Sequence, residues 1–316
     1  MIKLGYAYIV LAAVIFSTME ITAKLAVGLN PIQLNFLRFV IGGIILIPPT
    51  VKALKMKGVK LGKKDLYYFL CTGFLCVVVS MSFFQLAITY TKASIVAIIF
   101  STNPVFTVVL AYFILKEKLN RGTVISIVLS LIGIACILDP FASSSGIIGI
   151  VLSIMAAITF SLYSVVGKMR SGRYGSTALN CITFLVGSFI MLVIILITKL
   201  SAIRSMINPE GNYSFMSNIP VFAGINHQNI FPLIFLGVVV TGLGYLFYFL
   251  AMDETSATMA SVVFFIKPAL APILALIILG EKIPINTMVG ILFILIGSYF
   301  SLTAKGKAYK ENVEKA

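Results

Sequence analysis

The chain is poor in the residues that most soluble enzymes use for catalysis and metal binding. It has no tryptophan, one histidine and four cysteines, and only 11% of its 316 residues are charged. The single histidine, His227, excludes metal sites built from paired histidines, and its place in a long loop disfavours a buried catalytic role. The cysteines lie in apolar segments and lack the spacing of a disulfide framework or a zinc motif. With no Walker motif either, the sequence predicts no metal, no cofactor and no ATP-driven pump.

Apolar residues, by contrast, are abundant. They make up 60% of the chain, and the mean hydropathy is +1.09. A soluble domain of this size could not bury so much apolar surface, so the chain is predicted to lie in lipid, where helices satisfy their own backbone hydrogen bonds. The expected fold is an all-α integral membrane protein with ten transmembrane helices. Ten apolar stretches have the length of a bilayer span, at residues 4–23, 31–49, 66–87, 93–115, 122–138, 146–166, 177–198, 230–251, 256–279 and 285–303.

The net charge of +14 is unevenly distributed along the chain. With a cytoplasmic N-terminus, inside segments carry 17 lysines and arginines and outside segments carry five. This bias follows the positive-inside rule and predicts a multi-pass protein of the cytoplasmic membrane with both termini in the cytoplasm. It also argues against nucleic acid as a partner and favours the lipid bilayer.

The second half of the chain repeats the first. Residues 93–138 align without a gap on residues 257–302, at an offset of 164, with 15 of 46 positions identical. Two five-helix halves are predicted, residues 1–140 and 146–303, followed by a cytoplasmic tail at 304–316. Because five is odd, the halves cross the membrane in opposite directions, as in many secondary transporters, with a binding site near the midplane.

The repeated segments also resemble a known family. PVFTVVLAYFILKEKL (104–119) and PALAPILALIILGEKI (268–283), the LIG of 131–133 and 295–297, Ala87 with Ala251, and Arg38 after Pro31 are similar to the drug/metabolite transporter superfamily, of the ten-helix EamA type. The resemblance implies a transporter fold and little about the substrate, because members move amino acids, sugars, nucleotide derivatives, amines or drugs. Where members often carry Trp-Gly, this chain has Phe16-Ser17 and Phe160-Ser161.

Three ionisable residues fall inside predicted spans, where polar groups are costly and usually functional. Lys267 precedes Pro268, and its repeat counterpart Asn103 precedes Pro104. Each proline frees a backbone carbonyl and can bend its helix, so Lys267 and Asn103 are predicted to bind substrate or couple transport to pH. The alternatives for Lys267 are a structural ion pair with Glu20 and snorkelling to the interface.

The other two ionisable residues admit a similar choice. Glu20 could hold a cationic group or a proton, or form a salt bridge with Arg38 or Lys267. For Arg38 a structural or gating role is favoured over direct contact. Secondary candidates for the binding site supply hydroxyl, amide or aromatic groups: Ser17, Gln85, Ser161, Tyr163, Ser164, Tyr245 and Tyr248.

The function expected from these features is secondary transport by alternating access. One acid and one strong base in the core suit an amino acid or related zwitterion, moved by export, with a proton as a candidate coupling ion. An amine or a drug-like cation is the alternative. An integral-membrane enzyme would need clustered catalytic groups, and a pore would need a continuous polar stripe. The sequence shows neither feature. The chain is expected to act as a monomer or a homodimer.

Overall fold

The computed structural model describes residues 2–116, 121–137, 144–201, 214–254, 260 and 263–314, and the regular elements within them are all helical. The first part of the chain forms α1 (Ile2–Ser17), α2 (Met19–Leu25), α3 (Pro31–Ile45), α4 (Ile47–Met56), α5 (Lys63–Gly73), η1 (Phe74–Ser80), α6 (Met81–Tyr90), α7 (Ala93–Phe100), α8 (Asn103–Leu115) and α9 (Arg121–Ile137). The second part forms α10 (Ser144–Tyr174), α11 (Ser176–Ile197), η2 (Ser214–Met216), α13 (Ile230–Ile234), η3 (Phe235–Gly244), α14 (Tyr245–Glu254), α16 (Val263–Leu279) and α17 (Ile285–Glu314). The tail after residue 303 thus continues as helix to Glu314.

Six helical stretches in the described part of the chain are long and apolar enough to cross a membrane, which makes this a multi-pass membrane protein. The pair α3 and α4 would be a seventh span, although it bends by 48° at Leu46. Pro48 and Pro49 follow this bend, and because proline has no N–H group, they weaken the backbone ladder there. Three further apolar helices are shorter: Val124–Ile137, Ile266–Leu279 and Ile285–Phe300.

Several spans are interrupted near their middle. Helix α1 ends at Ser17 and α2 begins at Met19, while α7 ends at Phe100 and α8 begins at Asn103. Two other spans contain π-helical segments, η1 and η3, which are rare and often mark functional positions. When η1 is shifted by the repeat offset of 164 it covers residues 238–244, which lie inside η3.

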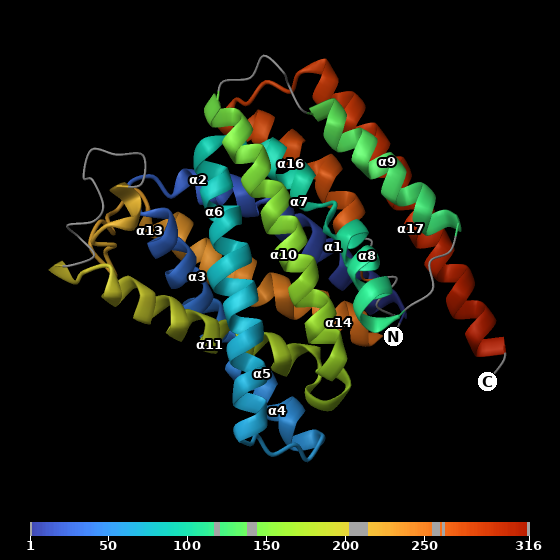
Figure 1. Cartoon of the computed structure of the whole chain (residues 1–316), viewed down its shortest axis with the longest axis horizontal. Coiled ribbons are helices and arrows are strands. Elements are labelled where there is room, and N and C mark those ends of the chain that lie inside the picture. Colours follow the sequence, from blue (N-terminus) through green and yellow to red (C-terminus); the bar gives the residue numbers. More distant parts are fainter. Residues whose placement is uncertain are drawn as a thin grey trace.

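Helices α9 and α17 lie side by side along one edge of the molecule (Figure 1). Their axes approach closely at two glycine positions. A Cβ atom added at Gly133 would lie 2.8 Å from the Gly290 carbonyl oxygen, and one added at Gly297 would lie 3.0 Å from the Ser126 carbonyl oxygen. The repeat offset converts the first contact into the second, because it carries Gly133 to Gly297 and Ser126 to Gly290.

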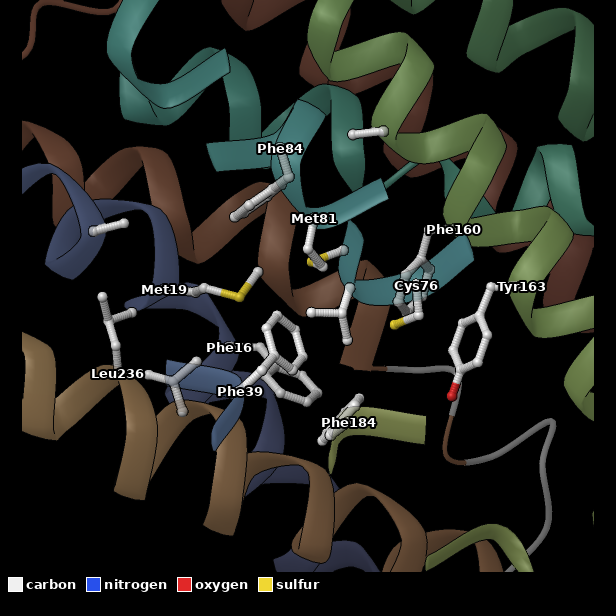
Figure 2. Close-up of a cluster of buried hydrophobic side chains, with 14 of the residues drawn as sticks. Phe16, Met19, Phe39, Cys76, Met81, Phe84, Phe160, Tyr163, Phe184 and Leu236 are labelled. Atoms are coloured by element: carbon white, nitrogen blue, oxygen red, sulfur yellow. The ribbon is translucent and has the colours of Figure 1, made fainter. Parts of the chain in front are cut away.

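The interior is filled by aromatic and sulfur-containing side chains from many spans. Figure 2 shows Phe16 and Met19 from the first span beside Phe39, Phe84 and Phe184 from others. Edge-to-face rings join Phe39 to Phe184 at a centroid distance of 4.8 Å. This core surrounds the few polar groups described next.

Candidate functional site

A cavity of about 400 Å³ lies between spans from both parts of the chain. Its walls come from α1, α2, α7, α8, α10, α11, α14 and α16. The deep end holds Lys267, of which 2% is exposed. The other end reaches the turn between α10 and α11, where Ser171 and Ser176 are half-buried and Lys168 is exposed. The cavity therefore connects a buried cation with one end of the molecule.

Lys267 is paired with Glu20, as one of the alternatives above foresaw. The distance from Lys267 Nζ to Glu20 Oε1 is 2.7 Å, and the two side chains are 2% and 0% exposed. Glu20 Oε2 is buried and accepts no hydrogen bond from the described residues. The ammonium group also faces the ring of Phe100, at 5.3 Å from its centroid. Lys267 lines the cavity and Glu20 does not, so Lys267 separates the Glu20 carboxylate from the cavity.

Arg38 is buried beside this pair without an acidic partner among the described residues. Its Nε donates to Asn35 Oδ1 at 3.3 Å, and Nη2 contacts Met81 Sδ at 3.2 Å. Its Nη1 has no hydrogen-bond partner there. The Phe84 ring lies near both cations, with its centroid 5.6 Å from Arg38 Cζ and 5.9 Å from Lys267 Nζ.

Asn103 and Pro104 sit at the break between α7 and α8 and line the cavity. Because Pro104 has no N–H group, the Phe100 carbonyl loses its helical donor, and Asn103 Nδ2 donates to that carbonyl at 2.9 Å. Part of the polar capacity predicted for Asn103 is thus used by its own backbone. Pro268, by contrast, lies inside the continuous helix α16 and does not line the cavity.

The predicted tyrosines all reach the cavity. Tyr245 and Tyr248 pack around Phe16, with ring centroids 5.1 and 6.2 Å away. Tyr163 donates from its hydroxyl group to Asn180 Oδ1 at 2.5 Å. Asn180 also lines the cavity and was missed from the sequence, because an asparagine near a helix start carries no distinguishing signal.

Of the remaining candidates, the structure brings one to the cavity. Ser164 lines it, while its hydroxyl group donates to the Phe160 carbonyl at 2.9 Å. Ser17 and Ser161 do not line it and bond to backbone carbonyls, Ser17 to Ala13 and Ser161 to Ala157 and Asn103, each at 2.7 Å. Gln85 is 2% exposed, outside the cavity wall, and its Oε1 has no hydrogen-bond partner in the described part of the chain. No group of three His, Cys, Asp or Glu side chains forms a metal-type cluster within the described ranges.

The end of the molecule away from the cavity mouth is held together by Glu281. Its Oε1 accepts from the Ala93 backbone N–H at 2.8 Å, and its Oε2 accepts from the Ser94 N–H at 3.0 Å and the Ser94 hydroxyl at 2.7 Å. Lys24 Nζ lies 3.5 Å from Oε1 and donates to the Thr91 carbonyl at 2.7 Å. One carboxylate thus joins α2, the start of α7 and the end of α16.

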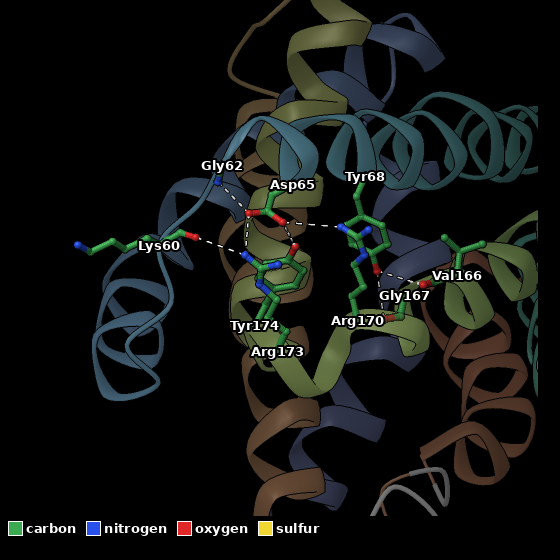
Figure 3. Close-up of polar contacts among 9 residues, drawn as sticks. All are labelled: Lys60, Gly62, Asp65, Tyr68, Val166, Gly167, Arg170, Arg173 and Tyr174. Carbon is green, nitrogen blue, oxygen red and sulfur yellow. Dashed lines mark hydrogen bonds and ion pairs between the residues drawn. The ribbon is translucent and has the colours of Figure 1, made fainter.

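At the mouth end, Asp65 joins the start of α5 to the end of α10 (Figure 3). Tyr174 donates to Asp65 Oδ1 at 2.5 Å, and Arg173 Nη2 lies 3.0 Å from Oδ2. Arg170 stacks on the ring of Tyr68 at 4.9 Å and lies 3.7 Å from Oδ1. These contacts position the stretch of α10 that carries Lys168 and Ser171 along the cavity.

Comparison with known proteins identifies the family of the chain. The profile of the EamA-like transporter family matches residues 3–139 and 147–303, so the chain belongs to that family. An uncharacterized transporter of Clostridium kluyveri is 42% identical over 315 residues, covering 97% of this chain and 95% of the relative. An uncharacterized transporter of Archaeoglobus fulgidus is 25% identical over 271 residues, covering 86% and 88%. One solved crystal structure superimposes with a TM-score of 0.61 at 15% identity, covering 94% of this chain and 96% of that one, which supports the fold alone. The family and these names indicate a membrane transporter and not an enzyme.

Proposed function

We propose that this protein is a secondary transporter that exports a small polar metabolite, an amino acid or related zwitterion, across the cytoplasmic membrane by alternating access. The observation that carries the proposal is the cavity of about 400 Å³, which leads from one end of the molecule to the buried Lys267. At the opposite end, the contacts of Glu281 join α2, α7 and α16 and would close the cavity on that side. A cavity of this volume suits a small molecule, and its closure at one end is what alternating access requires.

The proposed architecture is ten spans in two inverted halves, residues 1–140 and 146–303. It counts the bent pair α3–α4 and the three shorter apolar helices as spans. Two pairs of features that the offset of 164 relates support this architecture. The offset places η1 within η3, and it relates the Gly133–Gly290 contact to the Gly297–Ser126 contact. The two separate matches to the family profile fall on the same halves.

In the orientation that the positive-inside rule favours, both termini are cytoplasmic and the structure is in an inward-open state. Lys168, Arg170 and Arg173, at the cavity mouth, belong to a basic inside segment. Lys24 and Glu281, at the closed end, then face outward. Substrate would enter from the cytoplasm, and separation of Glu281 from Ala93 and Ser94 would release it outside.

The Lys267–Glu20 pair supplies a route to proton coupling. A substrate carboxylate that reaches Lys267 competes with Glu20 for the ammonium group. For export driven by an inward proton gradient, the proton would occupy Glu20 during the return of the empty carrier and leave when the substrate binds. Arg38 acts in this scheme as a gating or structural group behind the pair.

Counterflow across a sealed bilayer tests the function. Proteoliposomes that contain the purified protein are loaded with one unlabelled compound at a time, and uptake of the same compound in labelled form is measured. The compounds are amino acids, amines, sugars and nucleotides. We expect counterflow for at least one amino acid and its loss in Lys267→Gln, with Lys52→Gln on the exposed face of α4 as a matched control. Counterflow that is unchanged in a folded Lys267→Gln protein would contradict the role of this site.

A drug-like cation or amine is the second candidate substrate, favoured by Tyr163, Tyr245 and Tyr248 in the cavity wall. Counterflow for amines and not for amino acids would select it. An enzyme or a pore is a more distant alternative. A pore would show substrate leak without a requirement for internal substrate.

A further inference from the structure

The charged side chains that line the cavity all have the same sign. Lys267 lies at its deep end and Lys168 at its mouth, and no acidic side chain among the described residues lines it. Glu20 is 0% exposed and lies behind Lys267. A ligand at the deep end of the cavity therefore meets the Lys267 ammonium group before it meets Glu20.

The buried centre behind the cavity also has a positive balance. It contains one carboxylate, Glu20, and two cations, Lys267 and Arg38, so its described residues carry a net charge of +1. A proton transferred from Lys267 to Glu20 would not change this sum. Because a buried charge without a counter-ion is costly, an anionic group that enters the cavity would be stabilised there and a cationic group would not.

The rest of the wall is rich in aromatic rings. Eight of the 21 lining residues are phenylalanine or tyrosine: Phe16, Phe100, Phe160, Tyr163, Tyr245, Tyr248, Phe249 and Phe264. Ring faces and edges in this number favour a planar or branched apolar body. At the deep end, the charge that a ligand must match is thus that of Lys267.

We propose that the substrates of this transporter are amphipathic carboxylates, recognised through their carboxylate by Lys267 and through an apolar body by the aromatic wall. This inference rests on the proposed function and narrows it. An amino group on the substrate is tolerated and contributes little, because it finds no carboxylate in the described wall. An amine without a carboxylate is excluded.

Three probes with the same aromatic body separate the contributions of charge. They are 3-phenylpropanoate, phenylalanine and phenethylamine, which at neutral pH are an anion, a zwitterion and a cation. Binding to the purified wild-type protein in detergent is measured by titration calorimetry. We expect the acid and the amino acid to bind at least roughly tenfold more tightly than the amine, the ratio that one charge-assisted hydrogen bond supplies.

Two variants locate the effect. In the double variant Lys267→Met with Glu20→Gln, which removes the pair without leaving a lone charge from it, we expect the advantage of the acid over the amine to fall by roughly 10- to 100-fold. Lys52→Gln, on the exposed face of α4 and outside the cavity lining, should leave the ranking unchanged. The wild-type ranking alone tests the inference if the double variant does not fold.

The outcomes also separate this inference from the proposed function. Binding of the amine as tight as that of the acid, or no binding of any probe, overturns the inference. In either case counterflow of another compound in proteoliposomes would leave the transporter function intact. Loss of counterflow for every compound would overturn the function itself.

Discussion

The ion pair between Lys267 and Glu20 predicts a strong coupling between two substitutions. Both side chains are at most 2% exposed, and their charged atoms are 2.7 Å apart. Lys267→Met leaves Glu20 as a buried carboxylate, and Glu20→Gln leaves Lys267 beside Arg38. Removing one partner of a buried pair costs about 3–5 kcal/mol, whereas replacing both is often close to neutral.

We therefore expect each single variant to be less stable by about 3–5 kcal/mol and the double variant to recover most of that loss. In a chain of this size each kcal/mol shifts Tm by roughly 2–3 °C, so each single variant should lose roughly 6–15 °C. The chain has no tryptophan, so unfolding is best followed with a thiol-reactive dye that reports the exposure of buried Cys76 and Cys181.

The same double-mutant cycle can refute the reasoning. If the two losses add in the double variant, the side chains do not interact energetically and the pair is not a unit. Glu20→Asp is the control, since it keeps the charge but shortens the side chain. Its loss should lie between those of the wild type and Glu20→Gln.

Three further predictions concern closure, packing and topology. Glu281→Ala removes the carboxylate that joins three helices at the closed end. A membrane-impermeant thiol reagent added outside should therefore modify a cysteine placed in the cavity wall faster than it does in the parent protein. An equal modification rate would contradict the role of this contact. Gly290→Leu should destabilise the packing of α9 on α17 by about 1–3 kcal/mol, because a Cβ atom there would lie 2.7 Å from the Gly133 carbonyl oxygen. The loss should be measured as a lower Tm. Gly172→Ala should be neutral, since a Cβ atom at Gly172 would have no neighbour within 4 Å. In intact cells, thiol labelling should modify a cysteine placed at Asn212 and spare one at Lys57; the reverse pattern would overturn the proposed orientation.

Composition alone determined that the protein lies in lipid, because a soluble fold of this size could not bury the apolar surface of a chain that is 60% hydrophobic. The repeated segments with Pro104, Pro268 and the LIG motifs were sufficient to identify the EamA-like family, which the family profile confirms. Lys267, Asn103 and Ser164 could be selected from the sequence because polar residues in apolar spans are rare, and all three line the cavity.

Partner choice, by contrast, depended on the tertiary structure. The sequence left Glu20 with two candidate partners, and only the packing of α2 against α16 decided for Lys267, since the two residues are 247 positions apart. Arg38 could equally have been paired, and it contacts Asn35 of its own helix and Met81 and Phe84 of α6 instead. The partners of Glu281 could not be read from the sequence for the same reason, because Ala93 and Ser94 lie 188 and 187 positions away and no local pattern encodes that distance.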